Sequence, residues 1–168
     1  MLTSYLPMLA GASGSQRSEA EDITRDAMYI AGYSHNGTNS LATRWAWDGS
    51  AYTIMALGGA PLGSFAMALS EDGQVIVGAG GGQAFIWDPI NGYRNVMDVL
   101  VSLGIDMTGW TLTQGTGISF NGKTLCGLGT YNGIAQGWIA TVPEPSSLLA
   151  FAVGLTSLAG ALIRRRTR

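Results

Sequence analysis

The chain has 168 residues, of which 46% are hydrophobic and only 12% are charged, and 25 of them are glycine. This length suits one domain of ordinary size, and the glycine content favours many short strands joined by turns over long helices. Residues 1–147 contain five basic and eleven acidic side chains, a net charge of about −6 that disfavours phosphate backbones, so we expect no nucleic-acid partner.

The N-terminal stretch MLTSYLPMLAGASGSQ has no positively charged start, and Pro7 interrupts its apolar residues. It therefore does not match a secretory signal peptide. Residues 5–14 resemble residues 54–63, which belong to the repeat that follows. We expect the chain to be the last three or so units of a longer array with its own signal peptide; the alternative is that this product is not exported.

The body of the chain contains an internal repeat. Three stretches share one pattern: AEDITRDAMYIAG at residues 20–32, AMALSEDGQVIVG at 66–78 and GTGISFNGKTLCG at 115–127. In each, an apolar residue and Thr or Ser precede a turn built on Asp26, Asp72 or Asn121, and apolar residues then lead to a closing glycine. Because Asp-Gly and Asn-Gly accept the positive φ of tight hairpins, such stretches predict pairs of antiparallel strands.

Each repeat also has an aromatic element: TRWAWDG at 43–49, QAFIWDPING at 83–92 and QGWIATV at 136–142. About four short antiparallel strands over about 40 to 50 residues are typical of a propeller blade. The expected units lie near 20–65, 66–114 and 115–141, within a β-rich region at 1–141. One unit cannot bury both faces of its sheet and three rarely close a ring, so we expect a mainly β, partial β-propeller-like array.

The best-matching repeat, from Leu69 to Trp87, resembles the HAF-type extracellular repeats. Units of that family have an Ile-Ser-x-Asp-Gly-x-x-x-Val-Gly core followed by a Trp element, and residues 20–141 fit this pattern. The resemblance implies an extracellular location, and it implies no particular catalytic activity.

One helix is expected between the second and third units. Val96, Val99 and Leu100 recur at helical spacing, Asn95 can cap the start, and Gly104 can end the helix in a left-handed turn. This pattern predicts about two helical turns, with Trp110 packing the helix onto the sheets.

The candidate chemical groups of the body are expected to be structural. Asp48 and Asp88 follow a Trp at equivalent turn positions, where a carboxylate caps the turn backbone. Cys126 is the only cysteine, so no intramolecular disulfide can form, and we expect it at an inward, buried strand position. With His35 the only histidine, we expect no metal, no cofactor and no catalytic residue.

Two alternatives give the body a ligand. The tryptophans recur at strand positions, which favours core packing, but one on a rim could contact a sugar ring; they are Trp45, Trp47, Trp87, Trp110 and Trp138. An exported glycan-acting enzyme would need two carboxylates within about 5 to 10 Å in a cleft. The candidates for that pair are Asp48, Asp88, Asp98 and Asp106.

An uncharged stretch at 146–163 ends at Arg164, Arg165 and Arg166. As a helix it would be about 27 Å long, close to the roughly 30 Å hydrocarbon thickness, so it predicts one C-terminal transmembrane helix. The arginines, within the cluster at 164–168, favour the cytoplasmic side and place the body outside. The alternatives are an amphipathic helix packed on the domain and a permanently anchored protein.

Immediately upstream, Pro143, Glu144 and Pro145 bias the backbone to an extended conformation that a processing enzyme can grip. The order of motif, helix and arginine cluster over residues 142–168 resembles the PEP-CTERM sorting signal of exported proteins from Gram-negative bacteria. The resemblance implies processing by an exosortase in the inner membrane, with transient contact with lipid. It also makes extracellular polysaccharide a candidate partner.

Together these observations predict an exported, surface-sorted, non-enzymatic repeat protein of the envelope or extracellular matrix. We expect it to reside transiently in the inner membrane and then at the cell surface or outside the cell. The alternative function is an exported glycan-acting enzyme on a propeller scaffold.

Overall fold

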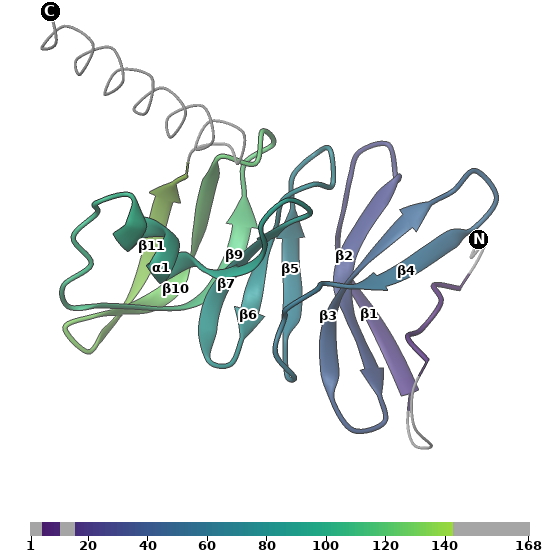
Figure 1. The fold of residues 1–168 in the computed structure, drawn as a ribbon, viewed down its shortest axis with the longest axis horizontal. Helices are drawn as coiled ribbons and strands as arrows, with labels where there is room; N and C mark the ends of the chain where they lie inside the picture. The colour runs from purple at the N-terminus through teal and green to yellow at the C-terminus, as the bar shows by residue number, and fades with distance from the viewer. Residues whose placement is uncertain (1–4, 11–15, 143–168) are drawn as a thin grey trace, which may run out of the picture.

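In the computed structural model, residues 5–10 and 16–142 are described, and their strands form three antiparallel sheets in chain order (Figure 1). The first sheet has β1 (Gln16–Ile23), β2 (Tyr29–Asn36), β3 (Ser40–Trp47) and β4 (Tyr52–Ala56). The second has β5 (Phe65–Leu69), β6 (Ile76–Gly80), β7 (Gln83–Asp88) and β8 (Gly92–Asn95). The third has β9 (Trp110–Ile118), β10 (Thr124–Tyr131) and β11 (Ile134–Thr141), and α1 (Val96–Ser102) precedes it.

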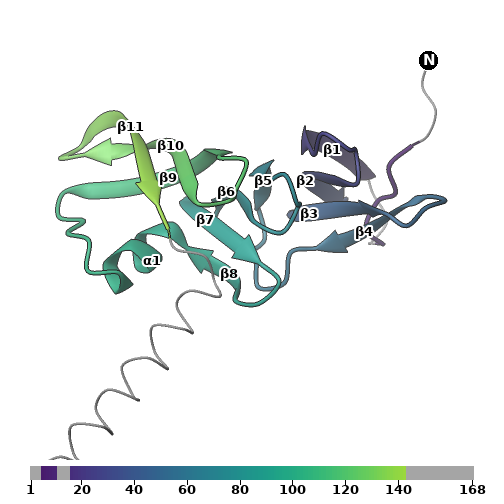
Figure 2. The same ribbon diagram turned by 90° about the horizontal axis from the view of Figure 1, so that it is seen from above.

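The three sheets stand in a row along the long axis of the molecule, as Figures 1 and 2 show from two directions. β5 packs against β1, β2 and β3, and β9 packs against β5, β6 and β7. Because side chains alternate along a strand, β7 supplies both interfaces of the middle sheet. Phe85 and Trp87 join the core facing the first sheet, whereas Ala84 and Ile86 join the core facing the third.

The expected mainly β, antiparallel fold is confirmed. The described residues form no closed barrel or propeller. The expectation of four-stranded units holds for two sheets and is wrong for the third, which has three strands within residues 110–141. A fourth strand after β11 would fall beyond residue 142, outside the described residues.

The Ser/Thr-x-Asp/Asn turn of each repeat is built by the same hydrogen bonds. In the second sheet, Ser70 N donates to Val75 O at 2.9 Å, and Val75 N donates to Ser70 Oγ at 2.9 Å. The Ser70 hydroxyl donates to Asp72 Oδ1 at 2.6 Å. The equivalent bonds join Thr24, Asp26 and Tyr29 in the first sheet, and Ser119, Asn121 and Thr124 in the third. The predicted hairpin turns are confirmed.

The glycine that closes each repeat stands where a second strand approaches too closely for any side chain. A Cβ at Gly78 would lie 1.9 Å from the carbonyl oxygen of Phe65, beside a β-bulge in β5. The same contact recurs at the other two glycines, at 2.0 Å for Gly32 with Glu19 and 1.9 Å for Gly127 with Gln114. The residues that supply these carbonyl oxygens are separated along the chain by the same numbers of residues as the three glycines. The three units therefore share the same close contact between strands, as well as the same sequence pattern.

The predicted helix is confirmed as α1, with Asn95 Oδ1 accepting a hydrogen bond from Met97 N at 2.7 Å. Its buried residues are Val96, Val99 and Leu100, and Gly104 has a positive φ of 79° directly after the C-cap. Trp110 packs against the same core cluster as the helix. The helix therefore covers part of the core between the second and third sheets.

The expected burial of Cys126 is wrong, because this side chain is exposed on the third sheet. Val77 and Ala31 occupy the equivalent positions of the other repeats and are fully buried. Each of those two faces is covered by the next sheet in the row, whereas Cys126 lies on the last sheet that residues 16–142 form. The repeat pattern identifies the position but does not show which unit ends the row.

Candidate functional site

The folded body extends to the residue that directly precedes the Pro-Glu-Pro motif. Val142 is 5% exposed, and its N–H donates to the carbonyl oxygen of Lys123 at 2.8 Å. This bond continues the pairing of β11 with β10, in which Thr141 lies opposite Thr124. The sheet therefore holds the chain in place up to Pro143.

The predicted sorting residues lie outside the described part of the chain. They are Pro143, Glu144, Pro145, Arg164, Arg165 and Arg166, together with the expected helix at 146–163. Within residues 5–10 and 16–142, no helix has the length and apolar character needed to cross a membrane.

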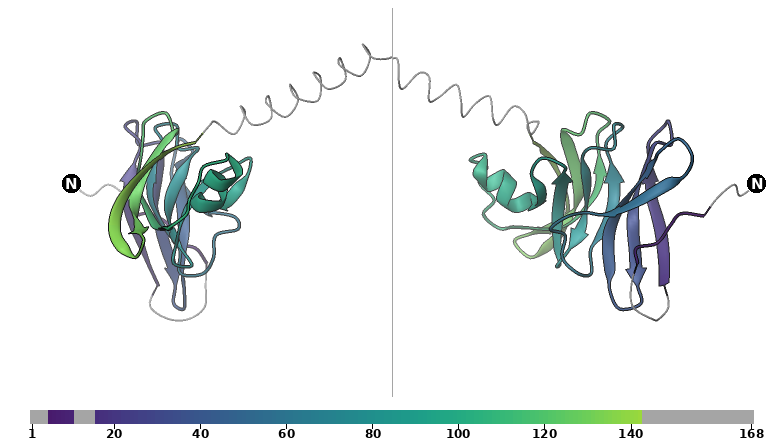
Figure 3. Two further views of the ribbon diagram at one scale, coloured as in Figure 1. Left: turned by 90° about the vertical axis from the view of Figure 1, so that its left-hand side faces the viewer. Right: turned by 45° about the vertical axis from the view of Figure 1, so that its right-hand side comes forward.

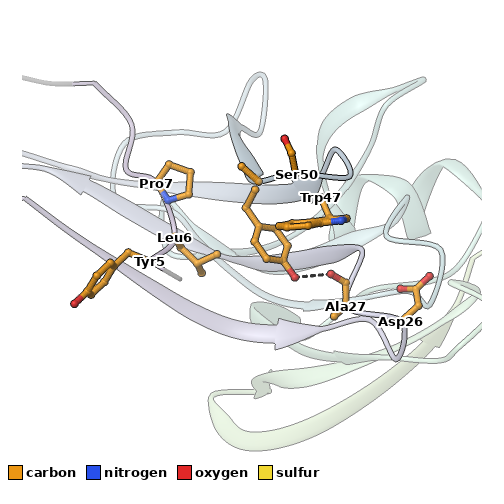
Figure 4. Close-up of a pocket in the computed structure, with 9 residues that line it drawn as sticks. Tyr5, Leu6, Pro7, Asp26, Ala27, Trp47 and Ser50 are labelled. Carbon is orange, nitrogen blue, oxygen red and sulfur yellow. Dashed lines mark hydrogen bonds between the residues drawn. The ribbon is translucent and has the colours of Figure 1, made fainter. Parts of the chain in front are cut away.

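A pocket of about 730 Å³ lies on the first sheet, on the side away from the second sheet. Figure 4 shows Tyr5, Leu6 and Pro7 on one side of it and Trp47, Ala27 and Asp26 on the other. Trp47 is half-buried and meets the ring of Tyr52 edge-on, with the ring centroids 5.1 Å apart. Trp47 therefore lies at the rim of this pocket, while Trp110 and Trp138 line a second pocket of about 510 Å³ beside α1.

The segment at 5–10 is fixed to this face by two hydrogen bonds. Trp45 Nε1 donates to the carbonyl oxygen of Pro7 at 2.8 Å, and Leu9 N donates to Ser34 Oγ at 3.0 Å. These contacts join residues 25 to 38 positions apart in the chain. Sequence patterns did not indicate the part that Tyr5, Leu6 and Pro7 play in the pocket, because no local motif marks them.

Asp26 contributes a carboxylate to the edge of the pocket. Hydrogen bonds donated by Met28 N and by the Thr24 hydroxyl lower the pKa of Asp26 below its ordinary value. Nearby, bonds from the N–H groups of Ala51 and Ser50 lower the pKa of Asp48 in the same way. Both groups are ionised at neutral pH, so this edge of the sheet offers hydrogen-bond acceptors and negative charge.

Three of the four aspartates considered for acid–base chemistry cap the turns in which they lie. Each of these carboxylates accepts hydrogen bonds from backbone N–H groups two or three residues further along the chain. The donors are Ser50 and Ala51 for Asp48, Ile90 and Asn91 for Asp88, and Thr108 for Asp106. Asp88 also forms an ion pair with Arg94, while Asp98 lies in the first turn of α1. The predicted turn-capping roles of Asp48 and Asp88 are confirmed. In the described part of the chain, no three His, Cys, Asp or Glu residues gather to hold a metal ion.

Comparison with known protein families identifies the PEP-CTERM protein-sorting motif at residues 141–166. The predicted sorting signal is thereby confirmed by its sequence pattern. The motif indicates export to the envelope or surface of a Gram-negative bacterium, and proteins that carry it are processed by exosortase. Comparisons with curated proteins and with solved structures found no match.

Proposed function

We propose that this protein is a non-enzymatic component of the bacterial envelope or extracellular matrix, delivered to the surface through its C-terminal signal. The observation that carries the proposal is the sorting motif at residues 141–166, attached directly to a folded β body. Since Val142 is held by the sheet and directly precedes Pro143, no linker separates the body from the motif. An exosortase would therefore process the protein with the third sheet close to the membrane surface.

The tail acts as a transient membrane segment in this proposal. The stretch at 146–163 contains no charged residue, so lipid is a better environment for it than water. Arg164, Arg165 and Arg166 then remain on the cytoplasmic side and keep the body outside. Cleavage near Pro143, Glu144 and Pro145 releases the body from the inner membrane.

We also assign the body to the HAF-type repeats, arranged as part of a propeller-like array. The support is geometric, since the turn and the closing glycine recur in all three units with the same contacts. Each sheet also covers the face of the preceding one, as stacked blades do. Such an array offers its surface for binding, which suits a matrix component.

The non-enzymatic role is supported by the use of the aspartates in turns. Extracellular polysaccharide is the proposed ligand, and the pocket at Trp47 is the proposed contact. A sugar ring has an apolar C–H face that can stack on an aromatic ring, and its hydroxyls can donate to a carboxylate such as Asp26.

The sorting part is tested with the full chain, tagged within the exposed β3–β4 turn, in a bacterium that has an exosortase. Replacing Pro143, Glu144 and Pro145 with alanine should leave the protein uncleaved in the inner-membrane fraction. Replacing Ser146 and Ser147 with alanine is the matched control and should leave surface delivery intact. Equal surface delivery of both variants would refute recognition through the Pro-Glu-Pro motif.

The ligand part is tested by co-sedimentation with extracellular polysaccharide purified from the same bacterium. Trp47→Ala should reduce binding by about tenfold, since stacking on an aromatic ring contributes on the order of 1 kcal/mol or more. Tyr131→Ala is the control, because Tyr131 is an aromatic residue that is 44% exposed and lies on the third sheet. Equal binding by the wild type and Trp47→Ala would remove the pocket from the proposal and leave the sorting part standing.

A further inference from the structure

The outer face of the third sheet is exposed and has an apolar patch at its centre, flanked by threonines. Cys126 and Ile139 lie opposite each other on β10 and β11, and Leu128 follows on the same face two residues along β10. Leu128 is 53% exposed and Ile139 is 76% exposed, and Cys126 is exposed as well. None of the residues of β9, β10 and β11 is charged. Exposed apolar strands without charges are unusual, because charged residues normally protect such surfaces from association.

The equivalent face of the second sheet binds another sheet of the same chain. Val77 lies opposite Ile86 there, as Cys126 lies opposite Ile139 in the third sheet. Val77 is fully buried and Ile86 is 3% exposed, because β9 lies over them. A Cβ at Gly115 of β9 would meet the Cβ of Val77 at 3.2 Å. This face of the repeat is thus a surface on which a sheet from the same protein packs.

We propose that the outer face of the third sheet packs against the same face of a second copy of this chain, in a two-fold symmetric dimer. Figure 3 (left) looks from that end of the row toward this face. In a two-fold contact, the same patch of both copies meets, so a patch that carries one sign of charge would oppose itself. The body up to Val142 has a net charge of about −5, and the uncharged third sheet is where two copies can approach with little repulsion.

A head-to-tail stack of copies is disfavoured by the other end of the row. The outward face of the first sheet is partly covered by residues 5–10, through the bonds from Trp45 to Pro7 and from Leu9 to Ser34, and the rest of it holds the pocket at Trp47. A contact between two third sheets uses the same patch on both copies, so it closes as a dimer and does not continue into a filament.

The size of the face sets the strength of the dimer. Three strands about 4.8 Å apart and eight residues at about 3.3 Å each give a face of roughly 380 Å². That is about half of the 800 Å² per partner found in stable complexes, so the dimer dissociates readily in dilute solution. Attachment of many copies to one cell surface raises their local concentration, which favours the dimer.

The test uses the full chain at high concentration in detergent micelles, with a short bismaleimide that joins two Cys126 thiols. The wild type should give a cross-linked dimer. Ile139→Lys places two positive charges against each other and should lower the dimer yield by about tenfold or more. Ile90→Lys is the matched control, since Ile90 is 66% exposed on the β7–β8 turn, and its yield should equal that of the wild type.

A second chain, carrying Cys126→Ser and Ser50→Cys, moves the thiol to an exposed turn of the first sheet. This chain should give no cross-linked dimer. A yield equal to that of the wild type would mean that the copies meet without the third sheet, and it would overturn the proposal. An unchanged yield with Ile139→Lys would overturn it as well, and so would sedimentation of the wild type as trimers or larger species. Thermal unfolding of the two lysine variants should be alike, which shows that the loss of dimer is not a loss of fold.

Discussion

Gly78→Ala tests whether the close approach of β5 to β6 at a closing glycine determines the packing of a unit. The new Cβ would lie 1.9 Å from the carbonyl oxygen of Phe65 and 2.8 Å from the ring of Phe85. Ordinary contacts lie beyond about 3.4 Å, so β5 must shift by more than 1 Å in a core that is covered on both sides. Overpacking of this kind costs about 3 kcal/mol, at the upper end of the usual range.

For a chain of this size, a loss of about 3 kcal/mol lowers the melting temperature by about 6 to 12 °C. The assay is thermal unfolding of the full chain in detergent micelles, followed by tryptophan fluorescence. Gly58→Ala is the control, because a Cβ there has nothing within 4 Å. It should be neutral or stabilising by up to about 1 kcal/mol, since alanine restricts the unfolded chain. Equal melting temperatures for the two variants would refute the close-contact explanation.

Three further predictions concern the turns. Ala27→Gly should stabilise the fold by about 0.5 kcal/mol, because Ala27 has a φ of 57° where the other repeats have glycine; a lower midpoint in urea would contradict this. Asp88→Ala should cost about 3 kcal/mol, because Asp88 is 2% exposed and its removal leaves Arg94 without its partner; chemical denaturation measures the loss. The pKa of Asp48 is lowered by hydrogen bonds in the fold, so its contribution is present above about pH 4 and is lost as the pH falls through the folded pKa. The melting temperature of Asp48→Asn should therefore fall less than that of the wild type between pH 5 and pH 3.

Local chemistry makes much of the body predictable from the sequence. The turn at Ser70 and Asp72 and the cap at Asn95 depend on side chains within a few residues of the backbone groups they bind. Their residue types therefore indicate their structure, and the same holds for the capping role of Asp48.

The wrong prediction for Cys126 and the pocket that the sequence did not indicate both depend on long-range contacts. The exposure of Cys126 depends on whether another sheet covers the third one, which the strand pattern of β10 does not encode. The pocket at Trp47 needs residues 5–7, whose place is set by a hydrogen bond from Trp45 across 38 positions. The sequence of the segment at 5–10 has no feature that indicates this contact.

The most direct test of the account is the mass of the C-terminal peptide of the protein isolated from the cell surface. We predict that this peptide ends near Pro143, Glu144 and Pro145 and lacks the segment at 146–168. A surface protein that still ends at Arg168 would contradict processing. A full-length protein found only in the cytosol would contradict export itself.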